Sequence, residues 1–395
     1  MRNKLFILYK ITILLLVLSS MKAYFLWEIP YIILTILSIG IGFGIGTKIK
    51  MNTALIAVSP LILLALLKLN LTYFISQLLS FIVIVQLLNL QYNRKLEILH
   101  FCIYSLSIIL SISLFFWIIN LFIVNIPAIS QIDYNEQYIF ENHIVFLRLV
   151  NFTGYYRFIS VFIEPGHLAM FSSFFLYASG FNMKSWYTWV FVLSILFSLS
   201  LAGYILLVLV YLFSLINQKK AAIKSSFIFS FFLLGGYLAL LQSGGDEILN
   251  EKIMMRLESD EESGIAGNNR TTLYTDATYD KFILTDNRWL GYSLNECQIK
   301  ERSGALQGAG YKIFLMRNGL IGVAFCLFFY LILAYKSTNR KFMMLFLLLF
   351  VVSFIQRAYP YWMAWMLPFL CTQCPRNIVS PKKLKYENQG AIYSK

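Results

Sequence analysis

Arg157-Phe-Ile-Ser-Val-Phe-Ile-Glu164-Pro-Gly-His167-Leu-Ala-Met places an arginine, a carboxylate and an imidazole in or beside an apolar segment long enough to cross a membrane. A carboxylate at membrane depth costs about 2.5–3.5 kcal/mol on insertion scales, so Glu164 is expected to face a protein interior or a wet cavity. Residues seven apart on a helix lie within about 20° of one face, which predicts that Arg157 and Glu164 share a face. The Pro-Gly pair predicts a broken helix that presents Arg157, Glu164 and His167 to a polar substrate. The alternative is a structural ion pair, or a carboxylate that stabilises the kink.

The composition of the whole chain indicates a membrane protein. Of the 395 residues, 59% are hydrophobic and only 13% are charged. A chain this apolar is not a soluble two-domain protein, and we expect an all-α polytopic membrane protein.

Apolar runs of spanning length predict about twelve transmembrane helices and a large outer loop that carries amphipathic helices. The predicted spans are residues 5–21, 29–47, 53–68, 71–92, 97–124, 157–181, 185–200, 202–217, 225–242, 310–335, 342–356 and 358–373. The chain then divides into spans one to five (1–124), a first outer loop (125–156), spans six to nine (157–242), the large outer loop (243–309), spans ten to twelve (310–373) and a cytoplasmic tail (374–395). The junction from Ser198 to Gly203 is either a tight turn or a break in one long helix.

Basic residues are distributed unequally between the alternate connections. With the N-terminus inside, the inner segments hold 19 of the 33 basic residues but only 2 of the 19 acidic ones. Because lysine and arginine accumulate on the cytoplasmic side, this asymmetry predicts a multi-pass protein of the cytoplasmic membrane with both termini in the cytoplasm. It also explains the net charge of +14 as topology and excludes nucleic acid as a partner.

Both long connections fall on the outer side. In the larger one, apolar residues recur at near-helical spacing within 248–257 and 273–282, which predicts two amphipathic helices lying on the membrane or over a cavity. Eight arginines remain outside the inner segments although the inside-positive bias should have depleted them: Arg148, Arg157, Arg256, Arg270, Arg288, Arg302, Arg317 and Arg357. The planar guanidinium fork matches phosphate oxygens, so such a cluster suits a lipid-linked pyrophosphate. The alternative is that each arginine pairs with a carboxylate of the loop.

We expect no metal and no cofactor. Three histidines are too few for a metal cluster, and Cys371-Thr-Gln-Cys374 lacks a second cysteine pair or a nearby histidine.

The segment that begins at Arg157 resembles the Arg…Glu-Pro-Gly…Leu-Ala segment of bacterial O-antigen and capsule polysaccharide polymerases, the Wzy type. The similarity covers roughly residues 150–325, and the order of the motifs carries it. It continues in Ser198-Leu-Ser-Leu-Ala-Gly-Tyr204, in Asn269-Arg270-Thr followed by Trp289-Leu-Gly-Tyr292, and in Tyr311 through Arg317-Asn-Gly319-Leu-Ile-Gly322.

The resemblance implies a metal-independent membrane glycosyltransferase. Such an enzyme transfers a growing glycan from undecaprenyl pyrophosphate onto the next lipid-linked repeat unit at the outer face of the cytoplasmic membrane. The implied partners are the undecaprenyl-pyrophosphate-linked oligosaccharide, membrane lipid, a chain-length regulator and a flippase.

Two alternative functions stay open. The related O-antigen ligases usually carry a histidine in the outer loop shortly before the Gly-Leu-x-Gly helix, and residues 296–316 contain none. A flippase for the lipid-linked glycan also needs a cationic cavity, but it predicts charge in both halves of the bundle. Here the intramembrane charge is confined to the sixth and tenth predicted spans.

The chemistry of the leaving group assigns a role to the arginines. Undecaprenyl pyrophosphate already leaves readily, so the enzyme needs cations at the developing negative charge rather than an acid. Arg270 is the first candidate for binding pyrophosphate, followed by Arg256, Arg288 and Arg317.

The acceptor assigns a role to Glu164. The acceptor hydroxyl must lose a proton as it attacks, and a carboxylate in low-dielectric surroundings becomes a better base. Glu164 is therefore the candidate base, Arg157 orients it or holds phosphate, and His167 is a substitute base or a sugar contact. Tyr204 and Tyr311 are candidate sugar contacts.

Overall fold

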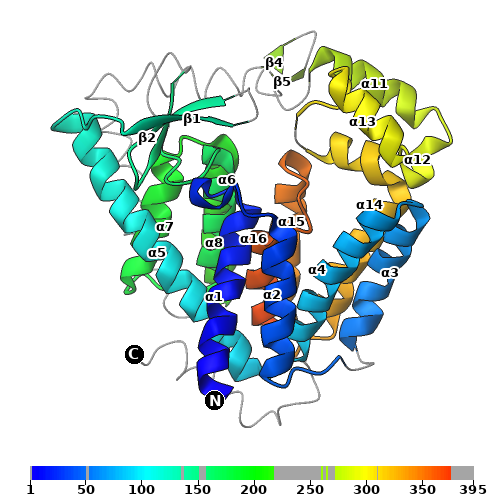
Figure 1. The fold of residues 1–395 in the computed structure, drawn as a ribbon, viewed down its shortest axis with the longest axis horizontal. Helices are drawn as coiled ribbons and strands as arrows, with labels where there is room; N and C mark the ends of the chain where they lie inside the picture. The colour runs from blue at the N-terminus through cyan, green and yellow to red at the C-terminus, as the bar shows by residue number, and fades with distance from the viewer. Residues whose placement is uncertain are drawn as a thin grey trace. The chain divides into compact units, whose positions relative to one another are not determined.

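The computed structural model describes residues 2–49, 53–134, 138–150, 157–217, 259–260, 264–265, 272–308 and 310–374 (Figure 1). Within these residues, four helices are long and apolar enough to cross a membrane: α1 (Arg2–Ser20), α4 (Leu71–Asn89), α5 (Tyr92–Phe122) and α14 (Tyr311–Tyr335). Shorter apolar helices are α2 (Tyr31–Gly44), α3 (Thr53–Leu67), α7 (Trp186–Phe197), α8 (Leu201–Asn217) and α16 (Met363–Thr372). The structure is thus mostly helical and membrane-associated, with four candidate spans rather than a confirmed set of twelve.

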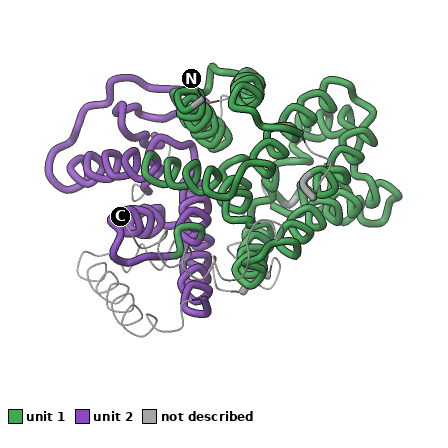
Figure 2. The backbone as a smooth tube through the Cα atoms, turned by 90° about the horizontal axis from the view of Figure 1, so that it is seen from below, with its two compact units in different colours: residues 1–105, 178–180, 271–395 green, residues 106–177, 181–270 purple. Residues whose placement is uncertain are grey.

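The chain forms two compact units (Figure 2). Unit 1 contains Met1–Ser105, Ala178–Gly180 and Thr271–Lys395, and unit 2 contains Leu106–Tyr177 and Phe181–Arg270. Helix α5 contributes its first part to unit 1 and its remainder to unit 2.

Unit 1 is a bundle of apolar helices. Helix α1 packs against α2 and α16, α3 packs against α4 and α14, and α14 packs against α15 (Arg340–Gln356). At one end of the bundle, the fully buried ammonium of Lys95 donates hydrogen bonds to the backbone oxygen and Oε1 of Gln373, both at 3.1 Å. These bonds tie the start of α5 to the end of α16.

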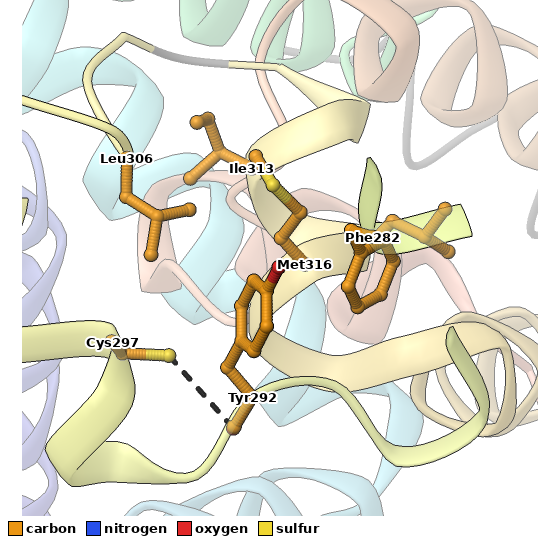
Figure 3. Packing of buried hydrophobic residues seen from close by; sticks show 7 residues of the cluster. Phe282, Tyr292, Cys297, Leu306, Ile313 and Met316 are labelled. Atoms are coloured by element: carbon orange, nitrogen blue, oxygen red, sulfur yellow. Dashed lines mark hydrogen bonds between the residues drawn. The ribbon is translucent and has the colours of Figure 1, made fainter. Parts of the chain in front are cut away.

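The segment predicted as the large outer loop contributes three helices to unit 1: α11 (Leu273–Ile283), α12 (Asn287–Leu290) and α13 (Leu294–Arg302). The predicted helix over 273–282 is confirmed by α11, whereas the predicted helix over 248–257 lies outside the described residues. The loop helices pack on the first turns of α14 through one apolar cluster (Figure 3). Its buried members are Phe282, Tyr292, Cys297, Leu306, Ile313, Leu315 and Met316.

Unit 2 contains an antiparallel three-stranded sheet that the all-α prediction left out. Strands β1 (Ser130–Tyr134), β2 (Tyr138–Asn142) and β3 (Leu147–Leu149) are neighbours in that order, within the segment predicted as the first outer loop. The strands are too short to show a strong period-two pattern in the sequence. Two strands of two residues, β4 (Ser259–Asp260) and β5 (Gly264–Ile265), pair farther along the chain.

The prediction of a helix starting at residue 157 is wrong. Helix α6 begins at Pro165 and ends at Ala178, and residues 157–164 are not helical. Ser160 has φ of +54°, and a residue that precedes proline is disfavoured in the helical conformation, so the chain enters the helix only at Pro165. Arg157 and Glu164 therefore do not share a helix face. The last predicted span, residues 358–373, also starts later than predicted, because α16 begins at Met363. The predicted ninth span and most of the tail lie outside the described residues.

Candidate functional site

Glu164 and His167 form a carboxylate–imidazole pair at the start of α6 in unit 2. The distance from Glu164 Oε2 to His167 Nε2 is 3.8 Å. The carboxylate side chain is 29% exposed, whereas the imidazole is 4% exposed. The first turn of a helix favours negative charge, because its backbone N–H groups point toward its N-terminal end. The pair therefore offers a partly accessible proton acceptor with a buried imidazole beside it.

Arg157 holds the junction between α7 and α8. Its Nε donates to the carbonyl oxygen of Ser198 and its Nη2 to that of Leu199, both at 2.9 Å. Two of the five N–H donors of the guanidinium thus bind carbonyl groups past the end of α7. The junction is a turn between two helices, and Leu199 adopts φ of +48° in it. Tyr204 belongs to the same junction, since its hydroxyl donates to the carbonyl oxygen of Leu196 at 2.7 Å.

The structure brings together the first two segments that carry the family resemblance. Besides the bonds from Arg157 to the α7–α8 turn, α6 and α8 approach closely at Gly203. A Cβ atom on Gly203 would lie 2.5 Å from Cβ of Ala169, so a larger residue would force the two helices apart. Glu164, His167, Arg157 and Tyr204 thus belong to one packed region of unit 2.

A second polar group lies in unit 2 on the sheet. Glu141 Oε2 is 3.3 Å from Nε of Arg148 and 3.8 Å from Nε2 of His143. The His143 ring stacks on Phe146 with centroids 4.4 Å apart. Burial lowers the pKa of His143 from its usual 6.5, and the nearby Glu141 only partly opposes this shift. Arg148 therefore pairs with a carboxylate of the same loop, which is the alternative that the sequence analysis gave for the eight arginines.

The remaining described site candidates belong to unit 1. Arg317 Nη2 lies 2.8 Å from Glu301 Oε1, so this arginine also pairs with a loop carboxylate, and its side chain is 45% exposed. Arg288 Nη1 donates to the carbonyl oxygen of Ile283 at 3.4 Å, and its guanidinium lies 5.5 Å from the centroid of its neighbouring tryptophan. Tyr311 is 40% exposed at the start of α14. Arg256 and Arg270 lie outside the described residues.

The other two segments of the resemblance cross each other in unit 1 at a pair of glycines. Gly319 interrupts α14 with φ of +69° and ψ of 178°, which only glycine adopts readily. A Cβ atom there would lie 2.2 Å from the carbonyl oxygen of Trp289. A Cβ atom on Gly291, whose φ is +76°, would lie 2.5 Å from the carbonyl oxygen of Arg317. The two backbones touch because neither residue has a side chain.

Lys68, which the sequence analysis did not single out, binds this crossing. It follows the last residue of α3, and its Nζ donates to the carbonyl oxygens of Leu290 at 2.8 Å, Tyr292 at 3.1 Å and Arg317. A signal for it existed in the sequence. Lys68 ends the third predicted span on the side where basic residues should be depleted, which is the same signal that distinguishes the eight arginines.

Comparisons with protein-family models, with curated proteins and with solved structures find no match for the chain. Among the described residues, no group of three or more histidine, cysteine, aspartate or glutamate side chains is placed to hold a metal ion.

Proposed function

We propose that the chain is a membrane polysaccharide polymerase of the Wzy type. It would transfer a growing glycan from undecaprenyl pyrophosphate onto the next lipid-linked repeat unit at the outer face of the cytoplasmic membrane. The observation that carries the proposal is the Glu164–His167 pair at the start of α6, in the segment that resembles the Glu-Pro-Gly motif. The proposal also includes cytoplasmic locations for both termini, which rest on the distribution of basic residues.

In this mechanism Glu164 accepts the proton of the acceptor hydroxyl. The hydroxyl oxygen then bonds to the anomeric carbon of the donor glycan while the bond from that carbon to the pyrophosphate oxygen breaks. Undecaprenyl pyrophosphate leaves with the electron pair, and arginines, first of all Arg270, stabilise its negative charge. His167 supports the proton acceptor. Arg157 acts as a positioning residue, because it fixes the segment before Glu164 to the α7–α8 turn.

The proposal is tested with purified full-length protein in lipid nanodiscs, supplied with lipid-linked repeat units alone. We expect polymerisation without sugar nucleotide or divalent metal, because the leaving group is already activated. Glu164→Gln keeps the size of the side chain but removes the proton acceptor, so turnover should fall by roughly 10²–10⁴-fold with donor binding retained. The matched control is Glu97→Gln, a change at an exposed glutamate of α5, which should leave turnover unchanged.

Two further outcomes decide the roles. Arg270→Lys should also abolish chain growth, because an ammonium cannot replace the bidentate guanidinium fork. If Glu164→Gln protein makes chains of wild-type length at the wild-type rate, Glu164 is not the base. Loss of activity in chelator with recovery in magnesium would contradict the metal-independent mechanism.

A further inference from the structure

A cavity of about 410 Å³ lies within unit 1, between the turn that joins α3 to α4 and the α12–α13 segment. Its volume is in the range of small-molecule sites. The apolar part of the wall comes from both sides and includes Leu64, Leu67, Leu69, Leu290 and Leu294. The polar part includes three asparagines, one lysine and one glutamate.

The two charged residues of the wall are already committed to protein groups. The Lys68 ammonium has three N–H donors, and three backbone carbonyl oxygens accept them. Glu296 Oε2 accepts hydrogen bonds from the backbone nitrogen and hydroxyl of Ser293, at 2.9 and 2.8 Å. One positive and one negative charge leave the lining with no net formal charge. A pyrophosphate would therefore find no uncommitted cation on this wall.

The side-chain amides of the three asparagines can bind a ligand on this wall. Among the residues that the structure describes, the side-chain amides of Asn287 and Asn295 make no hydrogen bond. Asn70 caps α4 with its Oδ1, which accepts from the backbone nitrogen of Tyr73 at 2.8 Å, and this leaves its amide nitrogen as a donor. Side-chain amides both donate and accept, as sugar hydroxyl groups do. Leucines complement the C–H faces of a sugar ring.

We infer that this cavity binds an uncharged, hydroxyl-rich ligand, namely the sugar portion of the lipid-linked repeat unit and not its pyrophosphate. The identification of the sugar with the repeat unit rests on the proposed function. The prediction of an uncharged, hydroxyl-rich ligand depends only on the neutral wall and the three side-chain amides, and not on that proposal.

The first test measures protection of a thiol in the full-length protein. All five native cysteines are buried, so an engineered surface cysteine is labelled selectively. In Asn295→Cys protein, an uncharged maleimide should react at least threefold more slowly in the presence of the repeat-unit oligosaccharide, released from its lipid carrier by mild acid. Inorganic pyrophosphate should not slow the reaction. The control Tyr274→Cys, at a residue of α11 that is 57% exposed, should be unaffected by either probe.

Protection of position 295 by pyrophosphate, or labelling that the oligosaccharide does not slow, would overturn the inference.

The second test distinguishes a failure of this inference from a failure of the proposed function. Combined Asn287→Leu and Asn295→Leu changes should raise the KM for lipid-linked repeat units about tenfold, with kcat within twofold of wild type. The control is Asn3→Leu, at an exposed position of α1.

The second test can show separately that the sugar-site inference is wrong or that the proposed function is wrong. If the wild-type protein polymerises and the double variant has an unchanged KM, the cavity is not the sugar site and the proposed function stands. If the wild-type protein makes no chains, the proposed function falls, and the protection experiment still decides whether the cavity takes a neutral oligosaccharide.

Discussion

Removal of the Lys68 ammonium should destabilise unit 1 by about 2–4 kcal/mol. A hydrogen bond with a charged partner contributes about 1.5–3 kcal/mol, and Lys68 makes three of them, to Leu290, Tyr292 and Arg317. The total is smaller than three full bonds because Lys68 is only half-buried and water replaces part of what is lost. In Lys68→Met the apolar stem is kept, so the change reports mainly the loss of the three hydrogen bonds.

The assay for Lys68→Met is thermal unfolding in detergent, followed by a dye that fluoresces when it reacts with newly exposed thiols. Cys297 is a suitable reporter because it is buried in the cluster beside the crossing that Lys68 binds. We expect a fall in the apparent Tm of several degrees. The matched control is Lys281→Met, at an exposed lysine of α11 whose side chain makes no hydrogen bond among the described residues, and its Tm should not change. A Lys68→Met protein that melts within 1 °C of wild type, on the order of the assay's resolution, would refute the reasoning.

Three further changes test other contacts. Gly319→Ala should destabilise unit 1 by more than about 3 kcal/mol, because it combines a forbidden backbone conformation with overlap on Trp289; a Tm equal to wild type would contradict the crossing. Because burial holds the pKa of His143 below 6.5, the unfolded chain takes up the proton first, and unit 2 should lose stability as the pH falls below 6.5. In His143→Phe that dependence between pH 7.5 and 5.5 should be smaller than in the wild type, as measured by melting at both values. Ser293→Ala should cost about 1 kcal/mol through loss of the cap of α13, measured by amide hydrogen exchange. In the wild type the same cap should weaken as the pH falls below 4.5, because the hydrogen bonds from Ser293 lower the pKa of Glu296.

The helices that are plain apolar runs could be predicted from the sequence to within a few residues. Residues 5–21 and 71–92 were predicted as spans, and the helices run over Arg2–Ser20 and Leu71–Asn89. Hydrophobicity does not reveal where the backbone leaves the helical conformation inside such a run. The eight residues before Pro165 were predicted as the start of a span, yet the proline and the left-handed Ser160 exclude them from the helix.

The candidate site was predictable only where both partners are side chains close in sequence. Glu164 and His167 are three residues apart, so any helix beginning near Pro165 brings them together. Arg157 and Lys68 instead bind backbone carbonyl oxygens, which every residue has, and no pattern of residue types identifies such a partner. The cavity asparagines were missed for a related reason, since elements more than 200 residues apart in sequence form its wall.

The contact between Gly291 and Gly319 has a consequence for how the chain can vary over evolution. The backbone of each segment occupies the space that a side chain on the other segment's glycine would need, so no single replacement at one position can be repaired by a single replacement at the other. Among descendants of this chain, we expect the two glycines to be inherited together. A lineage that loses one of the two glycines must also change the backbone conformation of the loop before α13, and this change would alter the carbonyl groups that Lys68 binds.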